Sequence, residues 1–212
     1  MRSCNGSKIF VLLALPFLLA YCTDDKKQAA AATPVKSDSE VLNSKAPNPF
    51  LPLDLSPADI IYLPIDYPVS KMSGNGNAAP IARVIYSRPH KQGRKIFGSL
   101  LKYGEPWRLG ANEATEIEFF QTVTVQNKKI TKGRYIMYCI PQADKWTIVL
   151  NSNVYSWGLT VDQSKDLYRF EIPVQQSEVA IEYFTMVFEN TDTGANLIMA
   201  WDDKISKLPI TI

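Results

Sequence analysis

The sequence contains few of the side chains that metal and thiol chemistry require. Among its 212 residues there are three cysteines and a single histidine, His90. Zinc sites need several histidine or cysteine ligands, so the ligand count excludes a site of that kind. A glycine-rich phosphate loop, a serine nucleophile elbow and a dinucleotide fingerprint are also missing. We therefore expect no metal ion, no cofactor and no catalytic residue that a motif would reveal.

Cysteine is too scarce to hold the fold together. Cys4 lies in an expected targeting segment and Cys22 at its end, which leaves only Cys139 for the folded part of the chain. One cysteine forms no internal disulfide, so the fold must rest on its core. Cys139 lies in the strand-like run RYIMYCIP, where a small buried side chain is the expected state. A nucleophilic thiol would need a nearby histidine, and His90 is far away in sequence.

An excess of charge of one sign is also missing. The 23 basic and 21 acidic residues give a formal net charge of +2 and are interspersed along the chain. Nucleic-acid binders usually carry a strongly basic face, so we expect no nucleic-acid partner. Hydrophobic residues make up 46% of the chain, which is enough for a single domain with its own core.

The chain has one long apolar run, IFVLLALPFLLA, from Ile9 to Ala20. Arg2 and Lys8 precede it, Pro16 interrupts it, and it is too short to span a bilayer as a mature helix. This pattern predicts a signal peptide over residues 1–21. The alternative is a buried N-terminal helix.

The end of this run, LLAYC, resembles the lipobox of a bacterial lipoprotein, in which the cysteine becomes the lipid-bearing first residue. That residue would be Cys22, although Tyr21 departs from the pattern and simple cleavage after Ala20 is the alternative. Asp24 and Asp25 resemble the acidic signal of surface lipoproteins in the Bacteroidota. We expect an exported protein that a lipid on Cys22 anchors to the outer membrane, either periplasmic or surface-exposed.

The anchor is followed by two segments of different composition. Residues 22–47 have almost no large apolar side chains, which predicts a disordered tether. From Phe50, FLPLDLSPADIIYLPIDYPVSK is too apolar for a linker and too rich in proline for a helix or a central strand. We expect an extended arm on the surface of a domain that covers residues 48–212. Ser56–Asp59 has the pattern of a single capped helical turn.

After the arm the chain has the pattern of β-structure throughout. About eight short runs of β-branched and aromatic residues are separated by turn signals such as PQAD, TDTG and WDDK. We expect strands at residues 81–86, 115–125, 133–140, 145–151, 166–174, 179–189, 195–203 and 205–212, with a bulge near Phe120. The absence of helical periodicity between them predicts an all-β domain, either a single antiparallel sandwich or a roll.

Several motifs resemble one protein family over residues 50–212. SRPHKQGRKIFG, LKYGEPWRLGANEATEIEF, KGRYIMYCIP, KWTIVLN and GANLIMAWDD are similar to the domain-of-unknown-function 2911 family of bacterial proteins. The long pattern YG-x-x-WR-x-GANEAT is the most specific of them. The resemblance implies a protein exported by Bacteroidota, and it implies no activity.

Polar residues that suit ligand binding gather in two expected loops. Arg88 and Arg94 flank a turn and could clamp an anion, or each could pair with an acidic side chain of the protein. Trp107 could stack on a ligand, and Gly110 indicates a positive φ or a close backbone approach. Loops on a rigid β scaffold commonly carry binding residues. The ligand-binding candidates are Arg88, Arg94, Trp107, Arg108, Asn112 and Glu113.

Three functional hypotheses follow from these residues. The leading one is a non-catalytic binding module of the cell envelope, for a small anionic or carbohydrate ligand or a protein partner. The second is a purely structural protein whose motif residues form a buried polar network. The third is a hydrolase that pairs Glu113 with Asp202 or Asp203.

Overall fold

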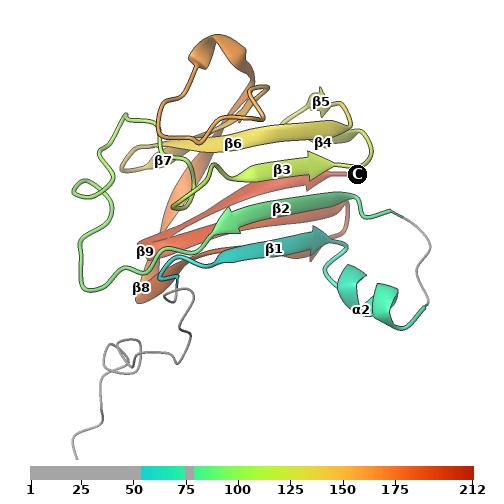
Figure 1. Cartoon of the computed structure of the whole chain (residues 1–212), viewed down its shortest axis with the longest axis horizontal. Helices are drawn as coiled ribbons and strands as arrows, with labels where there is room; N and C mark the ends of the chain where they lie inside the picture. The colour runs from blue at the N-terminus through green and yellow to red at the C-terminus, as the bar shows by residue number, and fades with distance from the viewer. Residues whose placement is uncertain (1–53, 75–78) are drawn as a thin grey trace, which may run out of the picture. The chain divides into compact units, whose positions relative to one another are not determined.

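The computed structural model describes residues 54–74 and 79–212. The expected signal peptide, the lipidation site at Cys22, the tether and the start of the arm lie outside the described residues. The described part is almost entirely antiparallel β-structure, which confirms the predicted all-β class (Figure 1). The elements are β1 (Ala58–Leu63), α2 (Tyr67–Met72), β2 (Ala82–Ser87), β3 (Glu116–Phe119), β4 (Val123–Val125), β5 (Lys128–Ile130), β6 (Gly133–Pro141), β7 (Lys145–Asn151), a 3-10 turn (Gln163–Lys165), β8 (Asp166–Thr191) and β9 (Gly194–Thr211).

The strands are hydrogen-bonded in the order β1-β2-β3-β6-β7-β8-β9-β4-β5 and fold into two layers. The long strand β8 belongs to both. Its first part, through Pro173, pairs with β7, and its second part, from Val174, pairs with β9. In Figure 1, β8 and β9 pass behind β1 and β2. One strand therefore supplies backbone hydrogen bonds to the front layer and to the back layer.

Alternation of side chains explains why these segments are strands. In β3, Ile117 and Phe119 are buried, whereas Glu116 and Glu118 face outward between neighbouring strands. Arg83 of β2 is the register partner of Glu118 and lies 2.6 Å from its carboxylate. Opposite charges in register stabilise a strand pair. The sequence thus specifies both the buried face and the charged face.

The core between the layers is rich in aromatic rings. Trp107 packs against Phe97, Trp146, Phe184 and Trp201 with ring centroids 4.9–6.1 Å apart. All five side chains are at most 6% exposed. Aromatic pairs at such separations add stabilisation beyond the burial of their area. The loop that carries Trp107 is therefore tied to the centre of the core.

Three expectations about the strands were wrong. Residues 115–125 do not form one bulged strand. The chain turns after Phe119, and β3 and β4 belong to different layers. The two strands expected at 166–189 are the single strand β8, and those expected at 195–212 are the single strand β9. No turn forms at WDDK. Asp202 has a φ of +53°, in the left-handed region, and the strand β9 continues through it.

The proline-rich arm also differs from expectation. Residues 58–63 form β1, which pairs with β2 and ends the sheet as an edge strand. An edge strand tolerates proline nearby because the backbone groups on its outer side form no hydrogen bonds with a neighbouring strand. No helical turn forms at Ser56–Asp59, whereas α2 has Pro68 in its first turn, where a missing N–H costs nothing. No helix in residues 54–74 or 79–212 has the length and hydropathy needed to cross a membrane.

The two layers are linked by a buried hydroxyl group. The Tyr86 hydroxyl of β2 accepts a hydrogen bond from the Met186 N–H of β8 at 2.9 Å. It also lies 3.2 Å from the Met186 carbonyl and 3.2 Å from the Asp59 carboxylate. Burial is the main reason that the pKa of Tyr86 rises to about 12.

We expect Tyr86→Phe to lower the free energy of unfolding by about 1–3 kcal/mol, because the buried Met186 N–H would lose its acceptor. Urea denaturation measures this change. The matched control is Tyr155→Phe, since Tyr155 is 90% exposed. Equal stability of the two variants would show that the Tyr86 hydroxyl does not link the layers.

Candidate functional site

The loop between β2 and β3 is docked on a gap in the pairing of β8. The ladder between β8 and β9 is irregular between Gln176 and Thr185. There the loop supplies the missing partners, because Lys91 N–H donates to the Glu182 carbonyl at 2.7 Å and Phe184 N–H donates to the Pro89 carbonyl at 3.0 Å. Backbone groups in a sheet need such partners. The loop is therefore fixed in place by β8.

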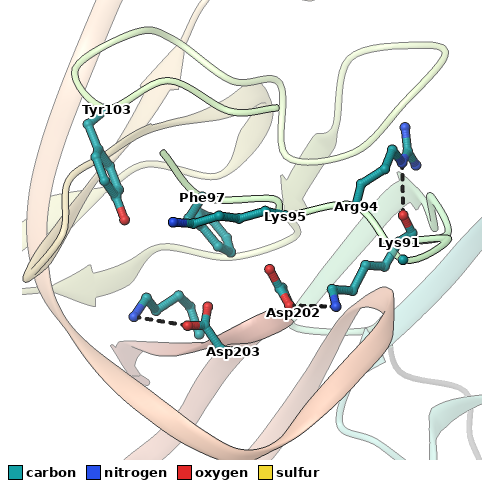
Figure 2. Close-up of a pocket in the computed structure, with 9 residues that line it drawn as sticks. Lys91, Arg94, Lys95, Phe97, Tyr103, Asp202 and Asp203 are labelled. Carbon is teal, nitrogen blue, oxygen red and sulfur yellow. Dashed lines mark hydrogen bonds and ion pairs between the residues drawn. The ribbon is translucent and has the colours of Figure 1, made fainter. Parts of the chain in front are cut away.

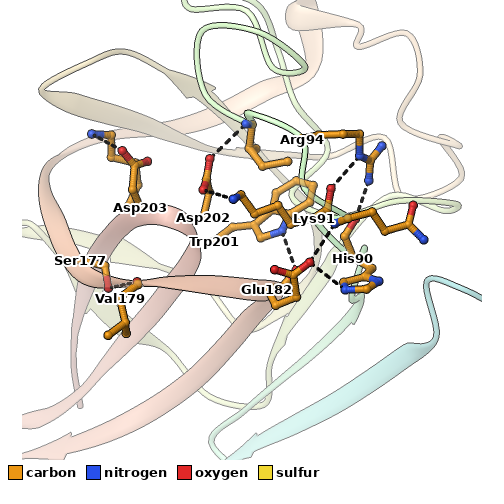
Figure 3. Close-up of polar contacts among 12 residues, drawn as sticks. His90, Lys91, Arg94, Ser177, Val179, Glu182, Trp201, Asp202 and Asp203 are labelled. Atoms are coloured by element: carbon orange, nitrogen blue, oxygen red, sulfur yellow. Dashed lines mark hydrogen bonds and ion pairs between the residues drawn. The ribbon is translucent and has the colours of Figure 1, made fainter. Parts of the chain in front are cut away.

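The single histidine strengthens this attachment. The His90 ring stacks on the Tyr183 ring with centroids 4.4 Å apart, and its Nε2 lies 2.8 Å from the Glu182 carboxylate. The same carboxylate accepts a hydrogen bond from the Gln92 N–H at 2.9 Å. Figure 3 shows His90 and Glu182 facing one another beside Trp201. His90 is mostly buried, with a side chain that is 12% exposed.

Asp202 holds the next part of the loop. Its carboxylate lies 3.1 Å from the Lys91 ammonium group and accepts a hydrogen bond from the Ile96 N–H at 3.1 Å. Asp202 is only 8% exposed. A buried carboxylate is tolerated when it is paired and hydrogen-bonded, as it is here. Its left-handed φ turns the side chain from β9 toward the loop, and such strained residues are enriched at functional sites.

A polar hollow of about 450 Å³ lies between this loop and β9. Four basic side chains and two carboxylates line it, together with two aromatic rings (Figure 2). These residues are Lys91, Arg94, Lys95, Lys204, Asp202, Asp203, Phe97 and Tyr103, with the backbone of Gly93. We call this hollow the basic pocket.

The two carboxylates of the basic pocket are already neutralised. Lys91 pairs with Asp202, and the Lys204 ammonium group lies 3.5 Å from Asp203. The other two basic groups lie within 4 Å of no carboxylate among residues 54–74 and 79–212. The Arg94 guanidinium donates to backbone carbonyls of its own loop, one of them 2.8 Å away at Lys91. Lys95 points into the hollow beside Tyr103 (Figure 2). The pocket thus carries a net charge of +2, from four basic and two acidic groups.

The candidate Trp107 is a core residue. It is 6% exposed, and aromatic side chains surround its ring. Its indole N–H donates to the Gly110 carbonyl at 3.2 Å, which closes the loop that follows. The burial of its ring therefore gives no support to the stacking role considered from the sequence.

Two more residues of the GANEAT motif have structural contacts. Gly110 approaches β2 so closely that a Cβ atom there would lie 2.9 Å from the Ser87 carbonyl oxygen, which confirms the expected close approach. Asn112 has a φ of +56° and donates to the Ser56 carbonyl at 3.2 Å and to Asp54 at 3.3 Å. Asn112 therefore holds the segment that leads into β1.

Arg88 also has protein partners. Its guanidinium lies 3.6 Å from the Asp59 carboxylate and donates to the Thr185 hydroxyl at 3.3 Å. It thereby connects β1 to β8 across the layers. This is the structural alternative that the sequence analysis left open for the arginine residues. Asp166 has a similar role, since Tyr138, Asn151 and Arg169 all bond to its carboxylate.

Arg108 and Glu113 are the two candidates without such contacts. Glu113 is exposed and lines a separate hollow with Tyr155 and Trp157. Arg108 is partly buried, and no ion pair or side-chain hydrogen bond joins it to any residue in the described ranges. Partial burial lowers the pKa of Arg108. Within the motif, Trp107, Gly110 and Asn112 therefore hold the loop in place, whereas Arg108 and Glu113 have no such contacts.

The structure does not bring the six candidates into one site. Arg94 lines the basic pocket, Arg108 lines a second hollow and Glu113 a third. Asp202 and Asp203 line the basic pocket without Glu113, so the geometry gives no support to the proposed pair of catalytic carboxylates.

The structure also bears on thiol and metal chemistry. Cys139 is fully buried in β6, and burial raises the pKa of its thiol well above the usual range. Within the part of the chain that the structure describes, no group of three or more His, Cys, Asp or Glu side chains could hold a metal ion.

Sequence reasoning missed most of the basic pocket. Lys91, Lys95, Tyr103 and Lys204 were not among the candidates. The signals were the polar runs HKQGRK and WDDK, which are more than a hundred positions apart. WDDK was interpreted as a turn, so nothing indicated that the two runs face one another.

Comparison with known families supports the resemblance seen in the sequence. A family model described as a protein of unknown function (DUF2911) matches residues 68–210. The match covers more than half of the chain, so the protein belongs to this family. It begins within α2, and β1 precedes it. The chain matches no curated protein and no solved structure.

We expect Arg108→Met to leave the free energy of unfolding unchanged or to raise it by up to about 1 kcal/mol, because the guanidinium is partly desolvated without a partner. Glu113→Gln should change it by less than about 0.5 kcal/mol. Urea denaturation tests both variants. Arg83→Met is the control, since it removes the pair with Glu118 and should cost about 1 kcal/mol. A loss of several kcal/mol in Arg108→Met would make Arg108 part of the scaffold.

Proposed function

We propose that the protein is a non-catalytic binding protein of the cell envelope, and that its basic pocket takes a small anion that also carries hydroxyl groups. The observation that supports this function most directly is the pair of basic groups, Arg94 and Lys95, at a hollow whose two carboxylates are already paired. A surplus of positive charge in a concave site attracts anionic ligands.

The shape and lining of the pocket favour a small polar ligand. A hollow of about 450 Å³ lies within the range of small-molecule sites, which is about 300–1,000 Å³. Tyr103 is 43% exposed and offers both a ring edge and a hydroxyl group. Asp203 can accept hydrogen bonds from ligand hydroxyl groups while it stays paired with Lys204. A uronic acid or a phosphorylated sugar has this combination of groups.

The structural hypothesis applies to other residues of the same protein. Arg88, Asn112 and Asp166 each have partners that tie elements of the fold together. Arg88 and Asn112 were ligand-binding candidates in the sequence, and these contacts account for both. They do not involve Lys95, which is exposed and has no ion pair with any residue of the described ranges.

We expect Lys95→Ala to weaken the binding of glucuronate about tenfold, because a hydrogen bond to a charged group is worth about 1.5–3 kcal/mol. Isothermal titration of the full-length protein in mild detergent measures the dissociation constant. Neutral glucose should bind at least tenfold more weakly than glucuronate. Raising the salt concentration should weaken glucuronate binding, because the site is open to solvent and its charge is screened.

The matched control for Lys95→Ala is Lys129→Ala. Lys129 is an exposed lysine of β5 and does not line the basic pocket. Its variant should bind glucuronate as the unmodified protein does. Equal affinity for glucose and glucuronate, or equal effects of the two lysine variants, would contradict the proposal.

We also propose that the protein reaches the envelope as a lipoprotein anchored at Cys22. The apolar run from Ile9 to Ala20 and the lipobox-like LLAYC support this location. Two or more acyl chains give stable attachment to a bilayer, since each buried methylene contributes about 0.8 kcal/mol.

We expect Cys22→Ala to move the protein from the membrane fraction to the aqueous fraction of its native cells or a related host. Metabolic labelling with palmitate should mark the unmodified protein and leave the variant unlabelled. Cys4→Ala is the control, because Cys4 lies in the segment that is expected to be removed. Labelling of the Cys22→Ala variant would place the anchor elsewhere.

A further inference from the structure

Arg108 differs from the other arginines that the structure describes. Each of the other five uses its guanidinium group in a contact with the protein. Their partners are Glu118 for Arg83, Asp59 for Arg88, a backbone carbonyl of Lys91 for Arg94, Glu116 for Arg134 and Asp166 for Arg169. In the described ranges, Arg108 alone has neither an ion pair nor a side-chain hydrogen bond.

This isolation is costly because Arg108 is not a free surface residue. Its Nε atom is buried and has no acceptor among the described residues. Burying part of a charged group without a partner is unfavourable, and proteins usually supply a partner. The Nε atoms of Arg83 and Arg88 are also buried without an acceptor, but both side chains have carboxylate partners at their other nitrogens. For Arg108 the natural candidate for a partner is an anionic ligand.

A hollow of about 180 Å³ lies beside Arg108, and we call it the arginine pocket. Leu100, Leu101, Pro106 and Leu159 contribute aliphatic surface to its wall, beside a lining that is otherwise polar. Leu100 is 47% exposed and Leu159 is 71% exposed, so apolar surface is open to solvent at this site. The hollow therefore combines one cation with aliphatic side chains.

The two charged residues at the edge of the arginine pocket cancel one another. The Lys102 ammonium group lies 3.7 Å from the Glu105 carboxylate. Both side chains are more than half exposed, so water screens them strongly. The uncompensated charge of the arginine pocket is the single positive charge of Arg108. A ligand that complements it carries one negative charge.

The opposite wall is brought against Arg108 by a glycine. Gly158 lies in the loop between β7 and β8 with a φ of +86°. A Cβ atom at this position would lie 3.0 Å from the Arg108 Cβ and 2.9 Å from the Ala114 Cβ. Only glycine allows both the conformation and this approach. The next residue, Leu159, is thereby held beside Arg108.

We propose that the arginine pocket is a second binding site, specific for a small monocarboxylate with a short aliphatic chain. The carboxylate pairs with the Arg108 guanidinium, which suits a planar, bidentate partner. The chain lies against Leu100, Leu101 and Leu159. The small volume and the single charge disfavour the larger hydroxylated anion of the basic pocket. The ligand is either a free short-chain acid or a larger molecule whose terminal residue carries both an apolar side chain and the free carboxylate.

Binding of acetate, propionate and butyrate to the full-length protein in mild detergent tests the proposal. Site-specific NMR signals, the Gly158 amide and the Arg108 Nε–H group, report binding at this pocket alone. We expect the dissociation constant to fall about fourfold for each added methylene, as burial of apolar surface predicts. The neutral analogue 1-butanol should bind with a dissociation constant at least tenfold higher than that of butyrate, as measured from these signals.

Two variants separate the charge from the apolar wall. Arg108→Met should weaken butyrate binding at least tenfold, whereas the control Arg134→Met should leave it unchanged. Leu159→Ala, at an exposed position, should reduce the gain from each methylene without abolishing acetate binding. If 1-butanol and butyrate bind equally, if affinity does not depend on chain length, or if Arg108→Met binds butyrate normally, the proposal is overturned.

Further measurements distinguish the two possible sources of the ligand, and they distinguish the two pockets from one another. Tighter binding of N-acetylleucine than of butyrate would identify a terminal residue as the natural ligand, and the reverse would identify a free acid. Lys95→Ala should not affect butyrate binding. If Lys95→Ala and Arg108→Met weaken butyrate equally, the two pockets are one site and this proposal fails. If the unmodified protein binds butyrate but not glucuronate, only the function proposed for the basic pocket is contradicted.

Discussion

The arrangement of the functional loops depends on the buried carboxylate of Asp202. Its left-handed backbone allows β9 to continue while its side chain points toward the loop before β3. The pair with Lys91 and the hydrogen bond from Ile96 then fix that loop at two points. Without these contacts the basic pocket would lose one wall, since the same loop carries Lys95. A strained strand residue is thus linked directly to the placement of a positively charged hollow.

The specific motif of the family has two kinds of residue. Trp107, Gly110 and Asn112 build the loop through core packing, close backbone approach and hydrogen bonds. Arg108 and Glu113 are carried by the same loop, and neither forms an ion pair or a side-chain hydrogen bond with any described residue. A rigid loop that presents side chains without internal partners is typical of a binding scaffold. The aromatic core therefore positions Arg108.

The class of fold could be predicted from the sequence, whereas the basic pocket and the arginine pocket could not. Alternation in runs such as EIEF and the turn signals between runs predicted antiparallel strands. Composition, however, could not show that β8 and β9 continue through apparent turns, because a left-handed Asp202 and a turn look alike in a sequence. Nor could spacing show whether Trp107 faces solvent or the core. The basic pocket joins residues between Lys91 and Tyr103 with residues of β9, and only the contacts of that loop with β8 and Asp202 bring them together.

The sharing of β8 has a consequence for how the domain comes apart. A sandwich with independent sheets can open between its layers while the backbone ladders stay intact. Here separation of the layers would require breaking the hydrogen bonds of one strand with either β7 or β9. We therefore expect the front layer, the back layer and the loop seated on β8 to unfold as one cooperative unit. We also expect partly open states that expose the core to be rare and unfolding to proceed in a single step.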